Sequence, residues 1–198
     1  LYRKYRPRKF SEVVGQEHVV RTLMGALSTG RIGHAFLFTG PRGTGKTTLA
    51  RIFAKVLNCH KKKDGEPCNS CDSCLAANLG NSLDLIEIDG ASNRNIDDVR
   101  NLKESANVAA PGGGYKVFII DEVHMFHKES FNALLKVLEE PPSHVVFVLA
   151  TTEPHKIPLT ILSRVQRFDF KRLTPAQIFQ KLTSIVKTEK INIEDEAL

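Results

Sequence analysis

The sequence predicts an α/β fold, in which helices cover a parallel β-sheet. Short apolar runs of strand length alternate along the chain with longer segments whose apolar residues recur at helical spacing. A glycine-rich turn joins the first of these runs, residues 35–39, directly to a helical segment. This alternation is typical of parallel sheets, because a chain that returns to pair in parallel needs a crossover, which is usually a helix.

The composition is that of a globular protein, and its basic charge favours polyanionic partners without establishing one. With 198 residues, 41% of them hydrophobic, the chain can bury one full core and begin a second small unit. No run approaches about 18 apolar residues and no basic segment leads into an apolar one at residues 1–6, so we expect a cytoplasmic protein with no membrane segment. The net charge of +6 favours polyanionic partners, but a solvated basic face would give the same excess.

The first elements lead up to the glycine-rich turn. Residues 1–15 are basic and interrupted by Pro7, which predicts an extended arm. Apolar residues at helical spacing then predict a helix from Gln16 to Leu27. The continuous apolar run 35–39 predicts a strand that is buried on both faces.

Residues 40–47 match the phosphate-binding pattern G-x-x-x-x-G-K-[ST]. Its glycines let backbone amides point at a phosphate, and the following helix, which we expect to end near Asn58, adds its positive N-terminus. Lys46 can reach the β- and γ-phosphates, and the Thr47 hydroxyl can bind Mg²⁺. A loop that only turns the chain is the alternative, but the strand before it and the helix after it favour a nucleotide site. The residues predicted to bind nucleotide here are Gly40, Pro41, Arg42, Gly43, Thr44, Gly45, Lys46, Thr47 and Thr48.

All four cysteines lie in one short insertion, residues 59–74, with the spacing C-x₈-C-x₂-C-x₂-C. Four thiolates with two tight C-x₂-C turns suit tetrahedral Zn²⁺, and a closed four-ligand site leaves no place for a reactive water. The sequence therefore predicts a structural zinc site with the ligands Cys59, Cys68, Cys71 and Cys74.

Three other interpretations of the cysteines are weaker. Disulfides are not expected in an intracellular ATP-binding protein, and a redox C-x₂-C pair does not require four cysteines. His60 could replace one ligand, but four cysteines already complete the site. A zinc-based DNA reader would use Lys61, Lys62 and Lys63, but no base-reading helix pattern follows them.

The second half of the chain continues the alternation of strands and helices. Apolar runs and helical spacing predict, in order, a strand at 83–89, a helix at 96–108, a strand at 116–122, a helix at 128–139, and strands at 145–150 and 167–170. The spacing of later apolar residues, starting at Ile178, predicts that 173–198 begins an all-helical lid domain after an ATPase domain at 1–172. We expect the chain to be a fragment that stops within this lid.

Acidic and polar residues follow two of the buried strands, on the side where parallel sheets bind ligands. Asp121 can hold Mg²⁺ and Glu122 can polarise the water that attacks the γ-phosphate. A solvated turn would also explain this acidic pair on its own, but the phosphate loop makes catalysis the better interpretation. Thr151 and Thr152 follow the next strand, where the γ-phosphate or the attacking water could be sensed.

With these motifs, the order along the chain resembles the AAA+ ATPases, and among them the gamma/tau family of clamp-loader subunits of bacterial DNA polymerase III. The cysteine insertion is the most discriminating part of this resemblance, which covers essentially residues 1–198. This chain departs from the family at Val165, where members of the family usually have Cys. The other matching segments are Tyr5-Arg6-Pro7, Val14-Gly15-Gln16, residues 119–125, 132–136, 138–142 and 149–154.

The resemblance implies ATP hydrolysis in a pentamer that loads a sliding clamp onto primer–template DNA during replication. It implies partners that include the delta and delta prime subunits, further gamma/tau copies, the clamp, and the polymerase core and helicase through regions outside this chain. Val13 and Val14 would lie near the adenine, Thr152 would be a sensor, and Arg164 would be an arginine finger that acts on ATP in the neighbouring subunit. This implied arrangement also requires ATP, Mg²⁺ and Zn²⁺.

DNA in such an assembly would be held through its backbone, by basic residues that we expect to include Arg94, Arg100, Lys103 and Lys136. Two other functions remain open. A helicase-type AAA+ motor for branched DNA would share the phosphate loop but would not need the cysteine insertion. A scaffold that binds nucleotide without hydrolysing it would be expected to lack Lys46, Thr47 or Glu122, and all three are present.

Overall fold

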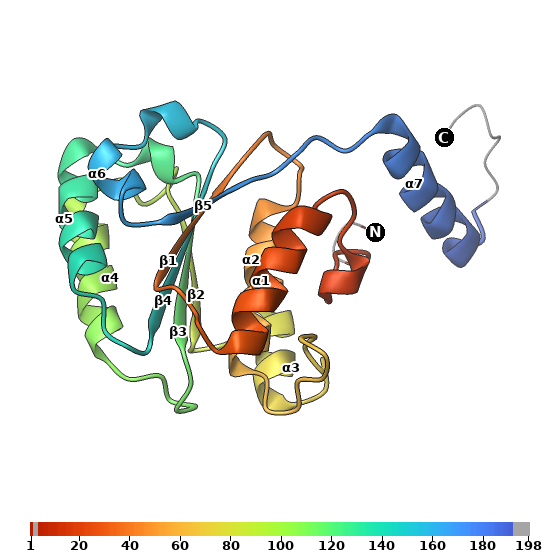
Figure 1. Cartoon of the computed structure of the whole chain (residues 1–198), viewed down its shortest axis with the longest axis horizontal. Helices are drawn as coiled ribbons and strands as arrows, with labels where there is room; N and C mark the ends of the chain where they lie inside the picture. Colours follow the sequence, from red (N-terminus) through yellow and green to blue (C-terminus); the bar gives the residue numbers. More distant parts are fainter. Residues whose placement is uncertain (2–3, 192–198) are drawn as a thin grey trace.

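The computed structural model describes residue 1 and residues 4–191 and contains one five-stranded parallel sheet in the order β2-β3-β4-β1-β5. Helices cover both faces, with α1 and α2 on one side and α4, α5 and α6 on the other, and α3 packs against α2 (Figure 1). The strands are β1 (Ala35–Thr39), β2 (Leu85–Asp89), β3 (Lys116–Asp121), β4 (Val145–Thr151) and β5 (Gln166–Asp169). The helices are α1 (Glu17–Thr29), α2 (Lys46–Asn58), α3 (Asp72–Leu79), α4 (Ile96–Asn107), α5 (Lys128–Glu139), α6 (Leu159–Leu162) and α7 (Pro175–Glu189).

The side-chain alternation along β1 divides the core between the two faces of the sheet. Phe36 and Phe38 point to the face covered by α2, where Phe53 meets the ring of Phe36 edge-on at 5.1 Å between centroids. Leu37 points to the opposite face and belongs to the cluster that contains Phe118 and Phe147, whose rings stack at 5.3 Å. Since both faces are packed, β1, β3 and β4 are apolar along almost their whole length, as expected for strands in the middle of a parallel sheet.

The expected strands and helices are present, with boundaries shifted by two residues or fewer. The extended arm is partly wrong, because a 3₁₀ turn, η1 (Phe10–Glu12), forms within it. Its cause is Phe10, which packs into the α1–α2 core with only 1% of its surface exposed. The sequence patterns also failed to predict α3, α6 and two further 3₁₀ turns, η2 (Val123–Met125) and η3 (Pro154–Lys156).

Helix α7 lies away from the sheet (Figure 1) and contacts the N-terminal segment, where the Tyr5 hydroxyl donates to Glu189 Oε1 at 2.5 Å. It starts with a capping box in which the Thr174 hydroxyl accepts from the Gln177 amide, and none of its residues is buried. Three of its large apolar side chains, Ile178, Phe179 and Leu182, are exposed. The lid domain predicted for 173–198 stays a prediction, and its last seven residues lie outside the described part of the chain.

Among the described residues, no helix has the length and the apolar content needed to cross a lipid bilayer.

Candidate functional site

The glycine-rich loop lies between the carboxyl end of β1 and the first turn of α2. Gly43 and Gly45 have φ angles of 80° and 94°, in the left-handed region that other residues rarely adopt. Gly40 is restricted further, because a Cβ atom there would lie 2.6 Å from the Phe170 carbonyl oxygen. The loop leaves the first amides of α2 without helical partners, and such amides form a ready site for an anion.

Lys46 is almost fully buried within this loop. Its Nζ atom donates to the carbonyl oxygens of Gly40 at 2.8 Å and Pro41 at 2.9 Å. Burial lowers the pKa of Lys46, while the nearby carboxylates of Glu122 and Asp121 act in the opposite direction. An anion bound in the loop would further stabilise the charged ammonium group.

One hydrogen bond joins the start of α2 to the end of β3, and another joins the residues that follow β3 and β4. The Thr47 hydroxyl donates to Asp121 Oδ2 at 2.6 Å, and the Thr152 hydroxyl donates to Glu122 Oε2 at 3.0 Å. The structure therefore brings the predicted Mg²⁺ ligands together, and it brings the predicted base together with the predicted sensor. The oxygen atoms of Thr47 and Asp121 are the type of ligand that Mg²⁺ prefers.

Glu122 has a left-handed backbone, with φ 47° and ψ 44°, which is uncommon for a residue with a side chain. Gly90 supports it at close range, since the Gly90 amide donates to the Asp121 carbonyl oxygen at 2.8 Å. A Cβ atom at Gly90 would lie 2.7 Å from the Glu122 carbonyl oxygen. The acidic turn is therefore held by a neighbouring segment that has room only for glycine.

Two cavities flank the loop. The larger, of about 600 Å³, is lined by Arg42, Lys46, Thr47, Asp121 and Glu122 among others, and also by Asp89, which the sequence patterns did not identify. The smaller, of about 230 Å³, is lined by residues from three parts of the chain: Pro7, Glu12, Val13, Val14, Gly43, Thr44, Gly45, Thr48, Leu173 and Lys181. Thr48 belongs to both cavities, so the two spaces meet at the start of α2.

Gln16 is a part of the site that the sequence interpretation missed. Its side chain is fully buried, accepts from the Lys171 amide at 3.0 Å, and donates to the Lys171 carbonyl at 2.7 Å and to the Thr44 carbonyl at 3.4 Å. Gln16 therefore joins the phosphate loop to the segment that leads into α7. A polar residue at the start of a predicted helix gave no signal of this role.

His124 was also missed, although its side chain is only 6% exposed beside Glu122. Its Nδ1 atom lies 2.9 Å from Thr151 Oγ1 and 3.4 Å from Glu122 Oε2, and its Nε2 atom lies 3.1 Å from Glu153 Oε2. The imidazole thus connects the ends of β3 and β4 behind the predicted base.

Arg164 does not line either cavity. It follows α6, where its guanidinium donates to Glu139 Oε1 and to the Thr160 carbonyl oxygen, both at 2.9 Å. The α5 and α6 helices lie across the sheet from α2 (Figure 1). Within one chain the structure therefore leaves Arg164 apart from the phosphate loop, bonded to the helices on the other face of the sheet.

Three of the four predicted DNA contacts lie around one surface cavity. Arg100 and Lys103 on α4 and Lys136 on α5 line a space of about 350 Å³. Arg94 is not part of this lining; its Nε atom donates to the Ala91 carbonyl oxygen at 2.7 Å.

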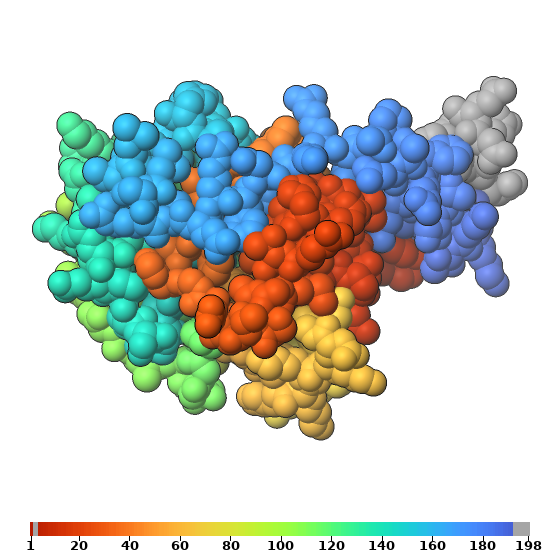
Figure 2. All heavy atoms as spheres, in the orientation of Figure 1, coloured from red at the N-terminus to blue at the C-terminus, as the bar shows by residue number. Residues whose placement is uncertain are grey.

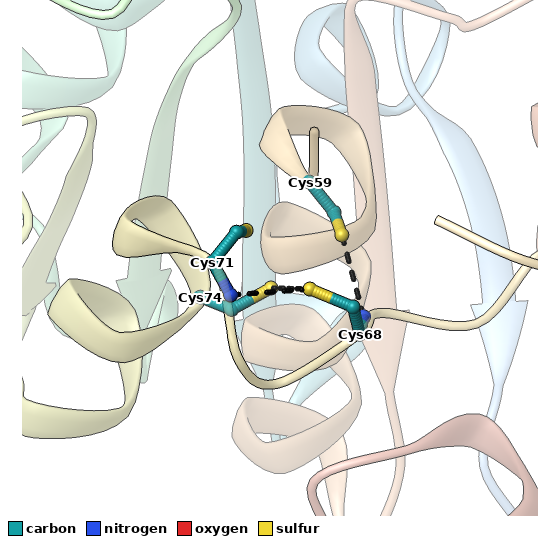
Figure 3. A group of neighbouring side chains, drawn as sticks. All are labelled: Cys59, Cys68, Cys71 and Cys74. Atoms are coloured by element: carbon teal, nitrogen blue, oxygen red, sulfur yellow. Dashed lines mark hydrogen bonds between the residues drawn. The ribbon is translucent and has the colours of Figure 1, made fainter. Parts of the chain in front are cut away.

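The four cysteines converge at the junction of α2 and α3, with every pair of sulfur atoms within 4.8 Å (Figure 3). Tetrahedral Zn²⁺ with Zn–S bonds of about 2.3 Å places its sulfur ligands about 3.8 Å apart. The Sγ atoms of Cys68 and Cys74 are 3.9 Å apart, close to this value. All four thiols are free of disulfides, so the donor set and its spacing fit a zinc ion.

Backbone amides already favour thiolate at this cluster. The amides of Ser70 and Cys71 donate to Cys68 Sγ at 3.4 and 3.3 Å, and the Cys68 amide donates to Cys59 Sγ at 3.3 Å. Hydrogen bonds, first from the Ser70 side chain and then from the Ser70 and Cys71 amides, lower the pKa of Cys68 to about 5, whereas burial raises the pKa of Cys74. A cation would be needed to hold all four sulfur atoms as thiolates.

The fold is similar to those of two solved Thermotoga maritima proteins. The Thermotoga maritima RuvB Holliday junction branch migration motor superposes with a TM-score of 0.66 at 23% identity, over 96% of this chain and 57% of that one. A Thermotoga maritima protein described as related to the DNA polymerase III gamma subunit gives 0.56 at 22% identity, over 85% of this chain and 51% of that one. These similarities confirm the predicted α/β fold of the AAA+ type.

The sequence comparisons are more specific. The chain is 53% identical to the DNA polymerase III subunit tau of Bacillus subtilis and 52% identical to that of Escherichia coli, with 100% of this chain aligned in both cases. It spans only 35% and 31% of those two subunits, and 55% of the Buchnera aphidicola gamma subunit, to which it is 46% identical. A family model described as DNA polymerase III, delta subunit, matches residues 15–174. The chain therefore belongs to the family of DNA polymerase III subunits to which the bacterial tau and gamma subunits belong.

Proposed function

We propose that the chain is the ATP-binding and ATP-hydrolysing part of a clamp-loader subunit, which helps to place a sliding clamp on primer–template DNA during bacterial replication. One observation supports this most directly: Lys46, Thr47, Asp121 and Glu122 surround one cavity, and Thr47 bonds to Asp121 at 2.6 Å. The membership of the DNA polymerase III family adds the replicative context. The chain covers about a third of the tau subunits, so the activity of the whole protein is part of this proposal.

ATP would occupy both cavities beside the phosphate loop. The loop amides and Lys46 would bind the phosphates, and Thr47 and Asp121 would hold Mg²⁺, which neutralises phosphate charge when bound. The adenine would enter the smaller cavity, beside Val13 and Val14. Since Lys181 and Leu173 also line this cavity, the start of the proposed lid domain, 173–198, would close against ATP held by the ATPase domain, 1–172.

Hydrolysis would use residues from two subunits. Glu122 would accept a proton from the attacking water, and Thr152, already bonded to Glu122, would act as the sensor by orienting that carboxylate toward the γ-phosphate. Arg164 would stabilise the transition state in a neighbouring subunit, consistent with its place outside both cavities of its own chain. Hydrolysis would then release the loaded clamp.

The proposed assembly is a pentamer of the delta, delta prime and gamma/tau type in the cytoplasm, and DNA would be held by its backbone. The cavity lined by Arg100, Lys103 and Lys136 supports this mode, because clustered cations bind phosphates without reading sequence. The cysteine cluster would hold structural Zn²⁺ at a distance from the chemistry. The likeness to RuvB concerns the fold alone and does not favour a branch-migration motor.

The test uses the full-length protein with its companion subunits, the clamp and primed DNA. The wild-type assembly should load clamps only with ATP, and DNA should stimulate its ATPase. Lys46→Ala should abolish nucleotide binding, whereas Glu122→Gln should bind ATP and stop turnover. Tight ATP binding by the Lys46 variant, or normal turnover by the Glu122 variant, would contradict the proposal.

A further inference from the structure

The N-terminal arm, residues 7–14, has the smaller cavity on one side and the cysteine insertion on the other. Pro7, Glu12, Val13 and Val14 line the cavity. The space-filling view shows the N-terminal segment, in red, next to the insertion, in yellow (Figure 2). Through its contacts with the arm, the insertion can affect the position of the residues that line the smaller cavity.

Glu66, in the loop between the first two cysteines, holds the start of η1. One of its carboxylate oxygens accepts from the Phe10 amide at 2.8 Å, and the other accepts from the Ser11 amide at 2.7 Å. These amides open a helical turn and therefore have no partner within it. Hydrogen bonds to a charged carboxylate are among the stronger ones, so Glu66 fixes the arm with two of them.

A tight turn fixes the position of Glu66 itself. Lys63 and Glu66 exchange backbone hydrogen bonds of 2.8 and 3.2 Å. The two residues between them, Asp64 and Gly65, both have positive φ angles, 51° and 76°, which is the geometry of a type I′ turn. This turn rests on α1, because a Cβ atom at Gly65 would meet Met24 at 3.1 Å.

Lys55 joins the same two segments from the core side. It is only 4% exposed, and its Nζ atom donates to the Arg8 carbonyl at 2.8 Å, to Asn69 Oδ1 at 2.6 Å and to Asn78 Oδ1 at 2.9 Å. All three ammonium protons therefore have acceptors, one on the arm, one in the insertion and one on α3. Burial lowers the pKa of Lys55, and a thiolate at Cys74 would act in the opposite direction.

We propose that the cysteine insertion is a brace for the base-binding arm, with Glu66 and Lys55 as its positioning residues. The insertion depends on its cysteines, because the loop from Lys61 to Pro67 contains no apolar residue able to form a core of its own. Four thiolates on a zinc ion would carry a net negative charge, which Lys55 would balance while it holds the arm. The contacts that form the brace do not depend on the proposed function, but its expected effect on ATP binding does.

The contacts of Glu66 and Lys55 fall on the part of the arm beside the smaller cavity, so the brace would act chiefly on the base side of the nucleotide. Glu66 and Lys55 contact the arm, which lines the smaller cavity, while Lys46 and Asp121 line the larger one. Loosening the arm should therefore weaken ATP binding and leave the binding of inorganic tripolyphosphate unchanged. A defect in the phosphate loop would weaken both ligands.

The experiment compares Glu66→Ala, Glu66→Gln and Asp64→Asn with the wild type in the full-length protein. Asp64→Asn removes a carboxylate from the same turn without touching the arm, and Asn tolerates its positive φ angle. Three quantities are measured: dissociation constants for ATP and tripolyphosphate with Mg²⁺, hydrogen exchange of residues 8–14, and zinc content.

Glu66→Ala removes both hydrogen bonds to the arm. We expect it to weaken ATP binding by about tenfold, because only part of the lost bonding energy would appear in the affinity, and to speed exchange in the arm. Glu66→Gln should change the ATP affinity and the exchange in the arm less than Glu66→Ala does. Asp64→Asn should match the wild type in both quantities. Zinc content and tripolyphosphate affinity should be unchanged in all three variants.

The brace is refuted if Glu66→Ala leaves exchange in the arm and ATP affinity as in the wild type. Equal weakening of ATP and tripolyphosphate would also refute it, because the effect would then lie in the phosphate loop. If the wild type bound neither ligand, the ATP site itself would be wrong, and hydrogen exchange of residues 8–14 would still decide whether Glu66 holds the arm.

Discussion

The Thr152 hydroxyl donates a hydrogen bond of 3.0 Å to Glu122 Oε2, although 30 residues separate the two in the sequence. They meet because β3 and β4 are parallel neighbours, so the residues that follow both strands come out at the same edge of the sheet. The bond restrains the side chain of Glu122, whose backbone is already in an uncommon conformation. Thr152 is thereby placed to control the orientation of the proposed base.

We predict that Thr152→Val lowers ATP turnover in the assembled complex by about ten- to a hundredfold, the range expected for the loss of one hydrogen bond to a charged group. The dissociation constant for ATP should change little, because Thr152 lines neither cavity beside the loop. Single-turnover hydrolysis and equilibrium binding separate the two effects. Thr152→Ser keeps a hydroxyl and should recover most of the rate; if Ser and Val behave alike, the hydrogen bond is not the cause.

A second prediction concerns Arg164. Arg164→Ala should leave ATP affinity unchanged, since the side chain is bonded to Glu139 and Thr160 and not to the phosphate loop. Turnover by the whole assembly should fall by about 10³-fold or more if the arginine is supplied in trans. The exposed ion pair with Glu139 contributes no more than about 1 kcal/mol, so a thermal melt should shift only slightly. Glu139→Gln is the matched control for loss of the ion pair and should keep its turnover.

Gly90 offers a test of the packing beneath the acidic turn. In Gly90→Ala the new methyl group would meet the carbonyl oxygens of Glu122 at 2.7 Å and Asp121 at 2.9 Å, and neither backbone atom can rotate away. We expect a loss of about 1–3 kcal/mol in the free energy of unfolding, measured by urea denaturation. Gly25→Ala, in an exposed part of α1 with no atom within 4 Å of the new Cβ, should instead be neutral or stabilising by up to about 1 kcal/mol. Equal stability of the two variants would contradict the packing.

Asp169 predicts a pH dependence of stability. A hydrogen bond from the Thr39 hydroxyl, assisted by Arg167, lowers the pKa of Asp169 from its ordinary value of 3.8. A lowered carboxyl pKa stabilises the folded state above about pH 4, and this contribution is lost as the pH falls through the folded-state pKa. Asp169→Asn should therefore cost about 0.5–1 kcal/mol at pH 7, a small value because the side chain is 67% exposed. The difference from wild type in urea denaturation should disappear near pH 2; a constant difference would contradict it.

The sequence predicted most of the sheet and the centre of the site, because both depend on local patterns. The apolar run before Asp121 could be buried only in the middle of a parallel sheet, and this placed Asp121 near the phosphate loop. The spacing of the cysteines likewise fixed which residues converge. In each case the prediction depends only on residues within one short segment of the chain.

What could not be predicted depends on contacts between distant segments. The fully buried side chain of Gln16 bonds to Thr44 and Lys171, and the pairing with Lys171 spans 155 residues. His124 lies between β3 and β4 only because those strands are neighbours in the sheet. Phe10 is buried in the cluster that includes residues of α1 and α2, and no local periodicity around Phe10 predicts this distant contact.

The last prediction concerns the metal. Cys68 has the most favourable environment for thiolate, with two backbone amides directed at its sulfur and a pKa of about 5. Cys68→Ser keeps the size of the side chain but supplies a much poorer zinc ligand. We expect the wild type to contain about one zinc ion per chain by metal analysis, and the variant to lose it.

Loss of zinc should loosen the cysteine insertion and leave the sheet folded. Without metal, hydrogen exchange should increase across residues 59–74 and stay slow in β1, β3 and β4, since those strands belong to the two apolar clusters and not to the cysteine cluster. His60→Ala is the matched control: this exposed side chain neighbours Cys59 but is not part of the converging set, so its zinc content should equal that of the wild type. A metal-free wild type with slow exchange in the insertion, or a His60 variant that loses its zinc, would show that the four sulfur atoms are not the metal ligands.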